Sequence, residues 1–249
     1  MTRNNEVGFS QRIQLEWLEY TSELASRGYG AGEISEALQH LLRDRLSVGG
    51  TGDRTNRDKA ITILMRTWVN VPRHIGLLRD DGLQLLRRLP LKDHLAVHWG
   101  MCTAVYPFWG QVAEVTGRLL RLQGVVTANL VQRRLREQMG ERETVSRAAR
   151  RVLRSFIDWQ VLSETDRKGV YQAPRSEEVR DRQLAAWLVD AIFFARGGTS
   201  VPMDELVHSP CLFPFNIEKS LLMFRTGSGR LEATRQGLDD EVLSRSTGH

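Results

Sequence analysis

Apolar residues recur every three or four positions along most of the chain, which is the spacing of an α-helix with one buried face. In the first half of the chain this pattern predicts helices over residues 9–25, 33–46, 55–69, 72–88, 91–105 and 107–122. The glycine-rich stretch SVGGTGDRTNRDKA, at 47–60, interrupts them. It follows no strand and lacks the Gly-Lys-Ser/Thr ending of a phosphate-binding loop, so we expect a linker there.

The pattern changes after residue 123. An amphipathic helix over 127–139 is followed by the turn GERE, which contains Gly140, and by a second helix that begins near Thr144. The strand-like segments QVLSE and GVYQA then flank the turn TDRKG, which predicts a β-hairpin. Helix, turn, helix and hairpin in this order indicate a winged helix-turn-helix.

These patterns divide the chain into three parts. We expect an N-terminal helical bundle over 1–122, a winged helix-turn-helix over 123–175, and a C-terminal helical segment over 176–249 that packs on the others. Within the last part the spacing predicts one long helix over 177–196 and a disordered end. The stretch FRTGSGRLEATRQGL, at 224–238, fits either a hairpin or a short helix. The expected fold class is mainly α, with a short β-hairpin wing.

The second helix of the predicted pair concentrates arginine on one side. A helix advances about 100° per residue, so spacings of three and four residues align four guanidinium groups in one stripe: Arg147, Arg150, Arg151 and Arg154. An apolar stripe points almost the opposite way and consists of Val145, Ala149, Val152, Leu153 and Phe156. One face is therefore expected to pack while the other projects charge into solvent.

The charge distribution makes nucleic acid a candidate ligand. The net charge is +5, and residues 118–154 hold ten arginines against three glutamates, so this segment exceeds the excess of the whole chain. A helix in the major groove and a hairpin tip at the backbone both call for basic residues. The candidate DNA-binding residues are Arg142, Thr144, Ser146, Arg147, Arg150, Arg151, Arg154, Arg167 and Lys168. No Asn or Gln occurs over 145–156 to read adenine, so we expect double-stranded DNA to be bound with low sequence specificity.

No motif in the sequence points to catalysis. His94 and His98 share a helical face, but no HExxH pattern or third ligand accompanies them, so we expect structural histidines. Adjacent acidic residues on a helix point about 100° apart and do not build a shared site. No nucleophile elbow, metal triad or Cys/His dyad occurs. We therefore expect no enzymatic activity, no metal and no cofactor.

Composition indicates the kind of core and the cellular compartment to expect for the protein. The aromatic residues of HLAVHWGMCTAVYPFWGQVAEV are more typical of a helical core than of a ligand pocket. The two cysteines, Cys102 and Cys211, lie far apart without a disulfide or ligand pattern, which fits a reducing cytoplasm. No apolar run reaches the roughly 20 residues of a membrane span. We expect a cytoplasmic protein without a membrane partner.

The order of these parts resembles the BrxA family of accessory proteins in BREX bacteriophage-defence systems. The resemblance lies in HLAVHWGMCTAVYPFWGQVAEV, LVQRRLREQMGERETVSRAARRVLRSFIDWQVL, SPCLFPF and LEATRQGLDDEVL, and covers about residues 10–243. It implies a NusB-like helical bundle, a winged helix-turn-helix, DNA binding without enzymatic activity, and methyltransferase and ATPase partners in antiviral defence. The family pattern fixes no individual arginine.

Two other functions fit the same residues. The basic face could meet an acidic protein partner, in which case the chain is a helical scaffold for protein contacts. Winged helices also serve in transcriptional regulators, so fold alone does not decide among these functions.

Overall fold

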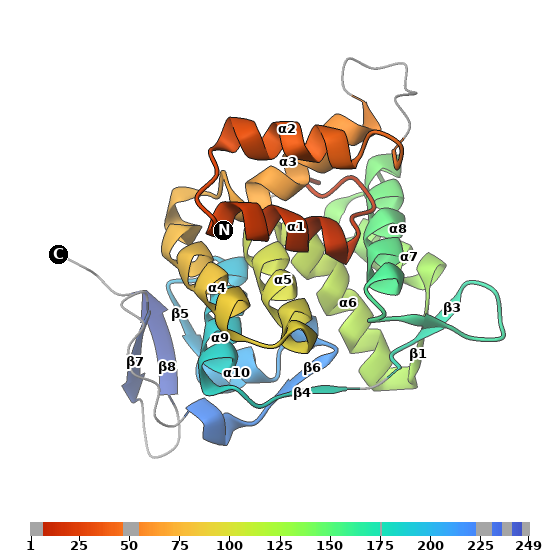
Figure 1. Cartoon of the computed structure of the whole chain (residues 1–249). Coiled ribbons are helices and arrows are strands. Elements are labelled where there is room, and N and C mark those ends of the chain that lie inside the picture. Colours follow the sequence, from red (N-terminus) through yellow and green to blue (C-terminus); the bar gives the residue numbers. More distant parts are fainter. Residues whose placement is uncertain (1–6, 47–54, 175, 223–230, 236–240, 246–249) are drawn as a thin grey trace.

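The computed structural model describes residues 7–46, 55–174, 176–222, 231–235 and 241–245, and Figure 1 shows its arrangement. Helices dominate the first half. They are α1 (Leu15–Ser26), α2 (Ala31–Leu41), α3 (Asn56–Trp68), the 3-10 helix η1 (Arg73–Ile75), α4 (Gly76–Arg88), α5 (Leu91–Val105) and α6 (Pro107–Gln123). The mainly helical fold class is confirmed, and the predicted bounds of α5 agree with the structure at both ends.

The start of the predicted first helix is wrong, because α1 begins at Leu15 and not at residue 9. Tertiary contacts hold the preceding residues out of a helix. The backbone N–H of Ile13 donates to Ser155 Oγ at 2.9 Å, and its carbonyl accepts from Trp159 Nε1 at 2.9 Å. The side chain of Arg12 also forms two hydrogen bonds to Asp158. This segment is thus attached to α8 (Glu143–Asp158).

The predicted start of the third helix, at residue 55, agrees with α3 to within one residue. Thr55 caps that helix: its Oγ1 accepts from the N–H of Asp58 at 3.1 Å, and its own N–H donates to Asp58 Oδ2 at 3.0 Å. This reciprocal pair makes residue 56 the first helical position. At the other side, α2 ends at Leu41 and not at residue 46. The remainder of the linker, 47–54, lies outside the described residues.

Helix α5 runs through the centre of the core. Trp99 is fully buried and packs on Phe156 of α8 at 4.8 Å between ring centroids and on Trp109 of α6 at 5.4 Å. Gly100 allows α9 (Arg182–Arg196) to approach, because a Cβ there would lie 2.4 Å from a ring carbon of Trp187. The predicted role of this aromatic stretch, a core and not a ligand pocket, agrees with this packing.

Six consecutive elements form a compact unit at one side of the bundle. After α6 come β1 (Val125–Thr127), α7 (Ala128–Met139), α8, β2 (Ser163–Glu164) and β3 (Val170–Gln172). The strands form an antiparallel sheet in the order β1-β3-β2, in which Tyr171 of β3 lies opposite Val126 on one side and Glu164 on the other. The predicted helix pair and hairpin are confirmed. Strand β1 was not predicted, because three residues between two helices give no periodic signal.

The predicted helix over 177–196 is wrong in its first turn. Residues 177–179 form β4 (Glu177–Val179), which pairs in parallel with β6 (Phe215–Ile217), and the helix α9 (Arg182–Arg196) begins later. Asp181 sets this start: one of its carboxylate oxygens accepts from the N–H of Leu184 at 2.9 Å, and both accept from Arg88. Between α9 and the end lie β5 (Ser200–Pro202), α10 (Met203–Val207), η2 (Pro210–Leu212) and η3 (Lys219–Leu222).

The end of the described chain is a sheet. Strand β8 (Glu241–Arg245) pairs antiparallel with both β5 and β7 (Leu231–Arg235). Within 224–238 the structure describes only residues 231–235, which form this strand and no helix. Residues 223–230, 236–240 and 246–249 lie outside the described residues, so the expectation of a disordered end stays a prediction. Figure 1 shows this sheet at the opposite side of the molecule from β1 and β3.

The three parts expected from the sequence share one hydrophobic core. It joins Trp99 of the first part, Phe156 of the second and Phe215 of the third, with Trp99 lying 6.0 Å from Phe215 between ring centroids. No helix within the described ranges is long and apolar enough to cross a membrane.

Candidate nucleic-acid interface

A short turn fixes the angle between α7 and α8. Gly140 ends α7 with a φ of +96°, a conformation that favours glycine over residues with side chains. Two residues later Arg142 takes an extended conformation before α8 begins at Glu143. The sequence prediction of a turn through Gly140 is therefore confirmed, and α8 starts one residue before the predicted position.

The two faces of α8 differ as the helical wheel predicted. The side that packs on the core consists of Val145, Ala148, Ala149, Val152, Leu153, Ser155 and Phe156, all buried. On the opposite side Arg147, Arg150 and Arg154 are exposed. Apolar packing thus holds α8 against the bundle and leaves three guanidinium groups facing solvent.

Arg151 departs from the predicted stripe. It is only partly exposed, and its Nη1 donates a hydrogen bond to the backbone carbonyl of Ser10. The N-terminal segment that lies along α8 therefore occupies this guanidinium group. The prediction of four equally available arginines needs this correction, because the helical wheel contains no information about a segment more than a hundred residues away.

Two of the three exposed arginines form ion pairs with carboxylates, both at the surface. Arg147 Nη2 lies 3.2 Å from Glu143 Oε2, and Arg154 Nη1 lies 3.7 Å from Glu164 Oε1, with both partners exposed in each pair. Arg150 forms no ion pair with any residue that the structure describes. Exposed ion pairs contribute about 0–1 kcal/mol, so these carboxylates compete weakly with a polyanion.

The remaining predicted residues differ in their surroundings. Thr144 is exposed at the start of α8, and exposed Arg142 also donates to the carbonyl of Met139 at 3.4 Å. Ser146 accepts a hydrogen bond from Arg136 Nη1 at 3.1 Å, so this side chain takes part in the contact between α7 and α8. Arg142 and Ser146 thus both make contacts within the fold.

The loop between β2 and β3 presents two exposed cations, Arg167 and Lys168. Thr165 N–H donates to the carbonyl of Val170 at 3.0 Å, and Gly169 has a φ of +77°, so the loop is a tight turn. Glu164 immediately before it pairs with Arg154 of α8. The loop therefore lies next to the arginine face of α8. Figure 1 shows it extending away from the helices.

A hollow of about 250 Å³ lies beside the arginine face. Its lining comes from the first half of α7, from exposed and buried residues of α8 and from the centre of β3: Ala128, Asn129, Gln132, Arg150, Leu153, Arg154 and Tyr171. The sequence reasoning missed Asn129 and Gln132. Their positions in an amphipathic helix gave no signal, because only the tertiary fold places the start of α7 next to Arg150 and Arg154.

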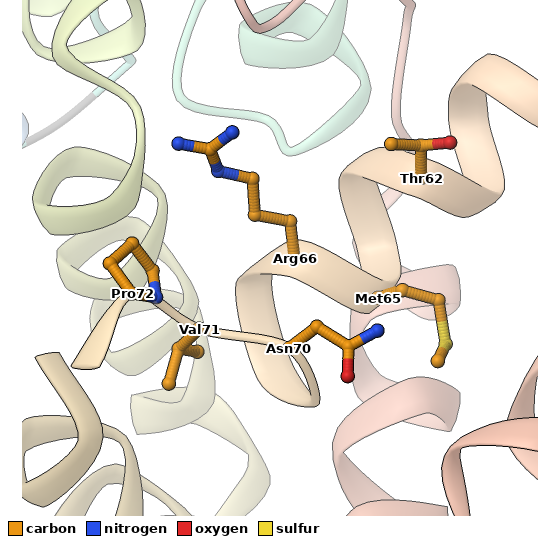
Figure 2. A pocket seen from close by; sticks show the side chains of 6 residues that line it. All are labelled: Thr62, Met65, Arg66, Asn70, Val71 and Pro72. Atoms are coloured by element: carbon orange, nitrogen blue, oxygen red, sulfur yellow. The ribbon is translucent and has the colours of Figure 1, made fainter.

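A second hollow of about 450 Å³ lies at the end of α3. Figure 2 shows its lining residues, with Thr62, Met65 and Arg66 on the helix and Asn70, Val71 and Pro72 on the segment that follows. Arg66 supplies the single charged side chain of this lining, and its guanidinium lies 5.7 Å from the ring centroid of Tyr106. This hollow has no second charged group with which to bind or activate a ligand.

His94 and His98 are bound to one carboxylate. Glu19 of α1 contacts His94 Nδ1 with one oxygen and His98 Nε2 with the other, each at 2.7 Å. His98 Nδ1 accepts from Trp68 Nε1 at 3.2 Å, which places the ring proton on Nε2. Among the described residues no group of three or more His, Cys, Asp or Glu side chains is placed to hold a metal ion. These contacts give both histidines a structural role.

The same cluster shifts two pKa values. Burial lowers the pKa of His98, and the hydrogen bond and charge of Glu19 offset this effect only in part. Burial raises the pKa of Glu19, but the hydrogen bonds and charges of His98 and His94 outweigh it and leave this pKa below its usual value. A neutral His98 that donates to an ionised Glu19 satisfies both groups.

The cysteines offer no reactive thiol. Cys102 and Cys211 are both buried and free. Burial raises the pKa of both thiols, that of Cys211 to about 11. Both side chains are therefore protonated at neutral pH, the form that is a poor nucleophile and metal ligand.

Comparisons of this chain with protein-family models, with curated proteins and with solved structures found no match. The geometry of α7, α8 and the β2–β3 loop is therefore the basis for assigning a function.

Proposed function

We propose that the elements from α6 to β3 form a winged helix-turn-helix and that the protein binds duplex DNA through it without catalysing a reaction. The order helix, strand, helix, helix, strand, strand and the sheet order β1-β3-β2 support this assignment. In such a module the second helix of the pair, here α8, enters the major groove, which at about 12 Å is wide enough for a helix.

The observation that carries the proposal is the unused charge on α8. Arg147, Arg150 and Arg154 are exposed, and their apolar neighbours on the other side already account for the packing of the helix. The β2–β3 loop adds Arg167 and Lys168 where a wing reaches a phosphate backbone. Four to six phosphate contacts give a slope of about −4 to −5 in log affinity against log salt.

The choice of DNA over an acidic protein rests on the form of the basic surface. A row of guanidinium groups along one helix, continued by a hairpin tip, matches a groove and its adjacent backbone. Arginine binds phosphate as well as guanine, and α8 offers no Asn or Gln over 145–156 for reading adenine. We therefore infer low sequence specificity.

The resemblance to the BrxA family extends the proposal to a biological role. In this role the protein is a cytoplasmic accessory factor of a BREX-like bacteriophage-defence system, and its DNA binding helps to position methyltransferase or ATPase partners. The helices of the first part correspond to a NusB-like bundle in this proposal.

The test compares two charge-reversal variants of the full chain. Arg147→Glu with Arg150→Glu changes the proposed interface, whereas Arg87→Glu with Lys92→Glu makes the same charge change at exposed positions of α4 and α5. Fluorescence anisotropy with a labelled random duplex measures affinity over a series of salt concentrations. The interface variant should bind at least about tenfold more weakly, because charged hydrogen bonds are lost. Its salt slope should become shallower by about two.

Folding and specificity controls complete this test. Both variants should keep the free energy of unfolding of the parent within about 0.5 kcal/mol per substitution, because the changed side chains are exposed. If both variants lose the same affinity for duplex DNA, net charge alone explains the loss, and the assignment of α8 as the DNA-binding helix is overturned. A parent protein that binds no duplex at low salt would favour the scaffold function. Strong preference for its own upstream DNA over random duplex would favour a transcriptional regulator.

A further inference from the structure

The hollow between α7, α8 and β3 combines a buried floor with a charged rim. Leu153 and Tyr171 are buried, whereas Arg150 and Arg154 are exposed and lie one helical turn apart on the same face of α8. At about 250 Å³ the hollow is larger than a phosphate ion. It therefore has room for an anion and part of the molecule to which that anion is attached.

The side chain of Gln132 is the unusual group in this hollow. It is 5% exposed and lines the hollow, yet its amide has no hydrogen-bond partner among the residues that the structure describes. Its amide atoms are not among the fully enclosed polar atoms without a partner, so the amide keeps contact with solvent through the hollow, where a ligand can replace water as its partner. An amide in this state at the wall of an open hollow is placed to bind a ligand.

The start of α7 adds a second group of donors. The first N–H groups of a helix have no partner within it and carry partial positive charge. Thr127 Oγ1 accepts from the N–H of Leu130 at 3.2 Å. Ala128 and Asn129, the first two residues of α7, line the hollow. Helix termini of this kind bind phosphate through their backbone N–H groups.

The charges around the hollow favour an anion. Arg150 and Arg154 are the charged residues of its lining, and the carboxylate that contacts either of them is Glu164, 3.7 Å from Arg154. That pair is exposed and weak. Guanidinium groups, a buried amide and helix N–H groups are all donors, and a phosphate group is an acceptor with several oxygens.

We propose that this hollow is a binding site for a single phosphate group. Gln132 and the first N–H groups of α7 bind it from one side, and Arg150 and Arg154 bind it from the other. If the phosphate belongs to DNA, the inference rests on the proposed function and identifies the contact that fixes the position of α8 along the duplex. The phosphate site itself does not depend on that function.

The first experiment uses inorganic phosphate as the probe. Two-dimensional NMR spectra of the full chain in phosphate and in chloride at equal ionic strength should differ at the backbone amides of Ala128 and Asn129 and at the side-chain amide of Gln132. In the variant Gln132→Met, which keeps a similar volume without a donor, phosphate affinity should fall about tenfold, because a hydrogen bond to a charged group is lost. Gln138→Met, at an exposed position of the same helix, is the matched control.

Two results would overturn the inference. One is a parent spectrum that is the same in phosphate and chloride, which is the outcome for a hollow that holds only water. The other is equal phosphate affinity in the parent and in Gln132→Met. A variant that does not fold is recognised from its spectrum, and Gln132→Leu then takes its place.

Duplex DNA distinguishes the source of the phosphate. If the site takes an internal phosphate, Gln132→Met should weaken binding equally for duplexes with and without a 5′-phosphate; if it takes a terminal phosphate, only binding of the phosphorylated duplex should weaken. Phosphate binding without any duplex binding would support the site and refute the proposed function. If Gln132→Met leaves duplex binding unchanged and the parent does not bind inorganic phosphate, the phosphate site is refuted and the proposed DNA binding is supported.

Discussion

Helices α5 and α8 are nearly equal in length and touch through Trp99 and Phe156, but they have opposite relations to solvent. From His94 to Val105, α5 is buried at all positions but one, and its polar groups are bound inside the protein. Trp99 Nε1, for example, donates to the carbonyl of Cys211 at 2.9 Å. Helix α8 buries one face only, and three of its arginines take no part in the core.

The difference between the two helices shows which residues the packing of the fold explains and which it leaves unexplained. A residue on α5 is constrained by packing on every side, so its identity is explained by stability. Arg147, Arg150 and Arg154 of α8 take no part in core packing, and a solvated surface does not require arginine at three positions of one stripe. Charge that the fold does not use is therefore the better guide to a ligand.

The largest expected effect tests the packed side of the comparison. Trp99→Ala removes a fully buried ring that contacts Trp109 and Phe156 and should lower the free energy of unfolding by about 3–5 kcal/mol. Urea denaturation followed by circular dichroism measures this change. Arg150→Glu, measured in parallel, should alter the same quantity by no more than about 0.5 kcal/mol. Similar losses in the two variants would remove the distinction between the helices.

A smaller effect is expected at the β2–β3 loop. Arg167→Glu with Lys168→Glu should weaken duplex binding about fivefold to tenfold, since two contacts to the phosphate backbone are lost from one end of the interface. Fluorescence anisotropy at constant salt measures the change, and the double variant of Arg87 and Lys92 is again the control. Unchanged affinity would confine the interface to α8 and exclude a role for this loop as a wing.

The smallest effect concerns the buried polar cluster on α5. His98 has a pKa below its usual value of about 6.5 in the fold, mainly because it is buried, whereas the unfolded chain restores the usual value. As the pH falls, the unfolded state therefore takes up a proton at a higher pH than the folded state does. The resulting contribution of His98 to the free energy of unfolding is complete above about pH 6.5 and is lost as the pH falls from there to the folded pKa.

His98→Gln removes this titration. Gln can still accept from Trp68 and donate to Glu19, so the variant should unfold with less pH dependence between about pH 7 and pH 5 than the parent. Thermal unfolding across this range measures the difference. His208→Gln, at an exposed position, should keep the slope of the parent. A parent slope that persists in His98→Gln would assign the pH dependence to other groups.

Local patterns in the sequence were sufficient to predict several elements of the fold. The bounds of α5 and α6 follow from apolar spacing and from Pro90 and Pro107 at their starts, and the turn between α7 and α8 follows from Gly140. Residues 9–14 and 177–181 were predicted wrongly because their periodicity is helical, whereas their backbone hydrogen bonds go to α8 and to β6. Long-range contacts of this kind override local preference.

The candidate site was predictable to the same extent. A helical wheel is sufficient to separate Arg147, Arg150 and Arg154 from the buried face. It gives no information on the contact between Arg151 and Ser10, or on the hollow that Gln132 lines, because both depend on segments that meet only in the folded chain.

The attachment of residues 10–13 to α8 has a mechanical consequence. Through Ser10, Arg12 and Ile13, the beginning of the described chain is joined to Arg151, Asp158, Ser155 and Trp159 along one flank of the helix. Rotation of α8 against the bundle would break all of these bonds together. A duplex bound by α8 would therefore have one fixed orientation relative to the bundle and to any partner protein that binds there.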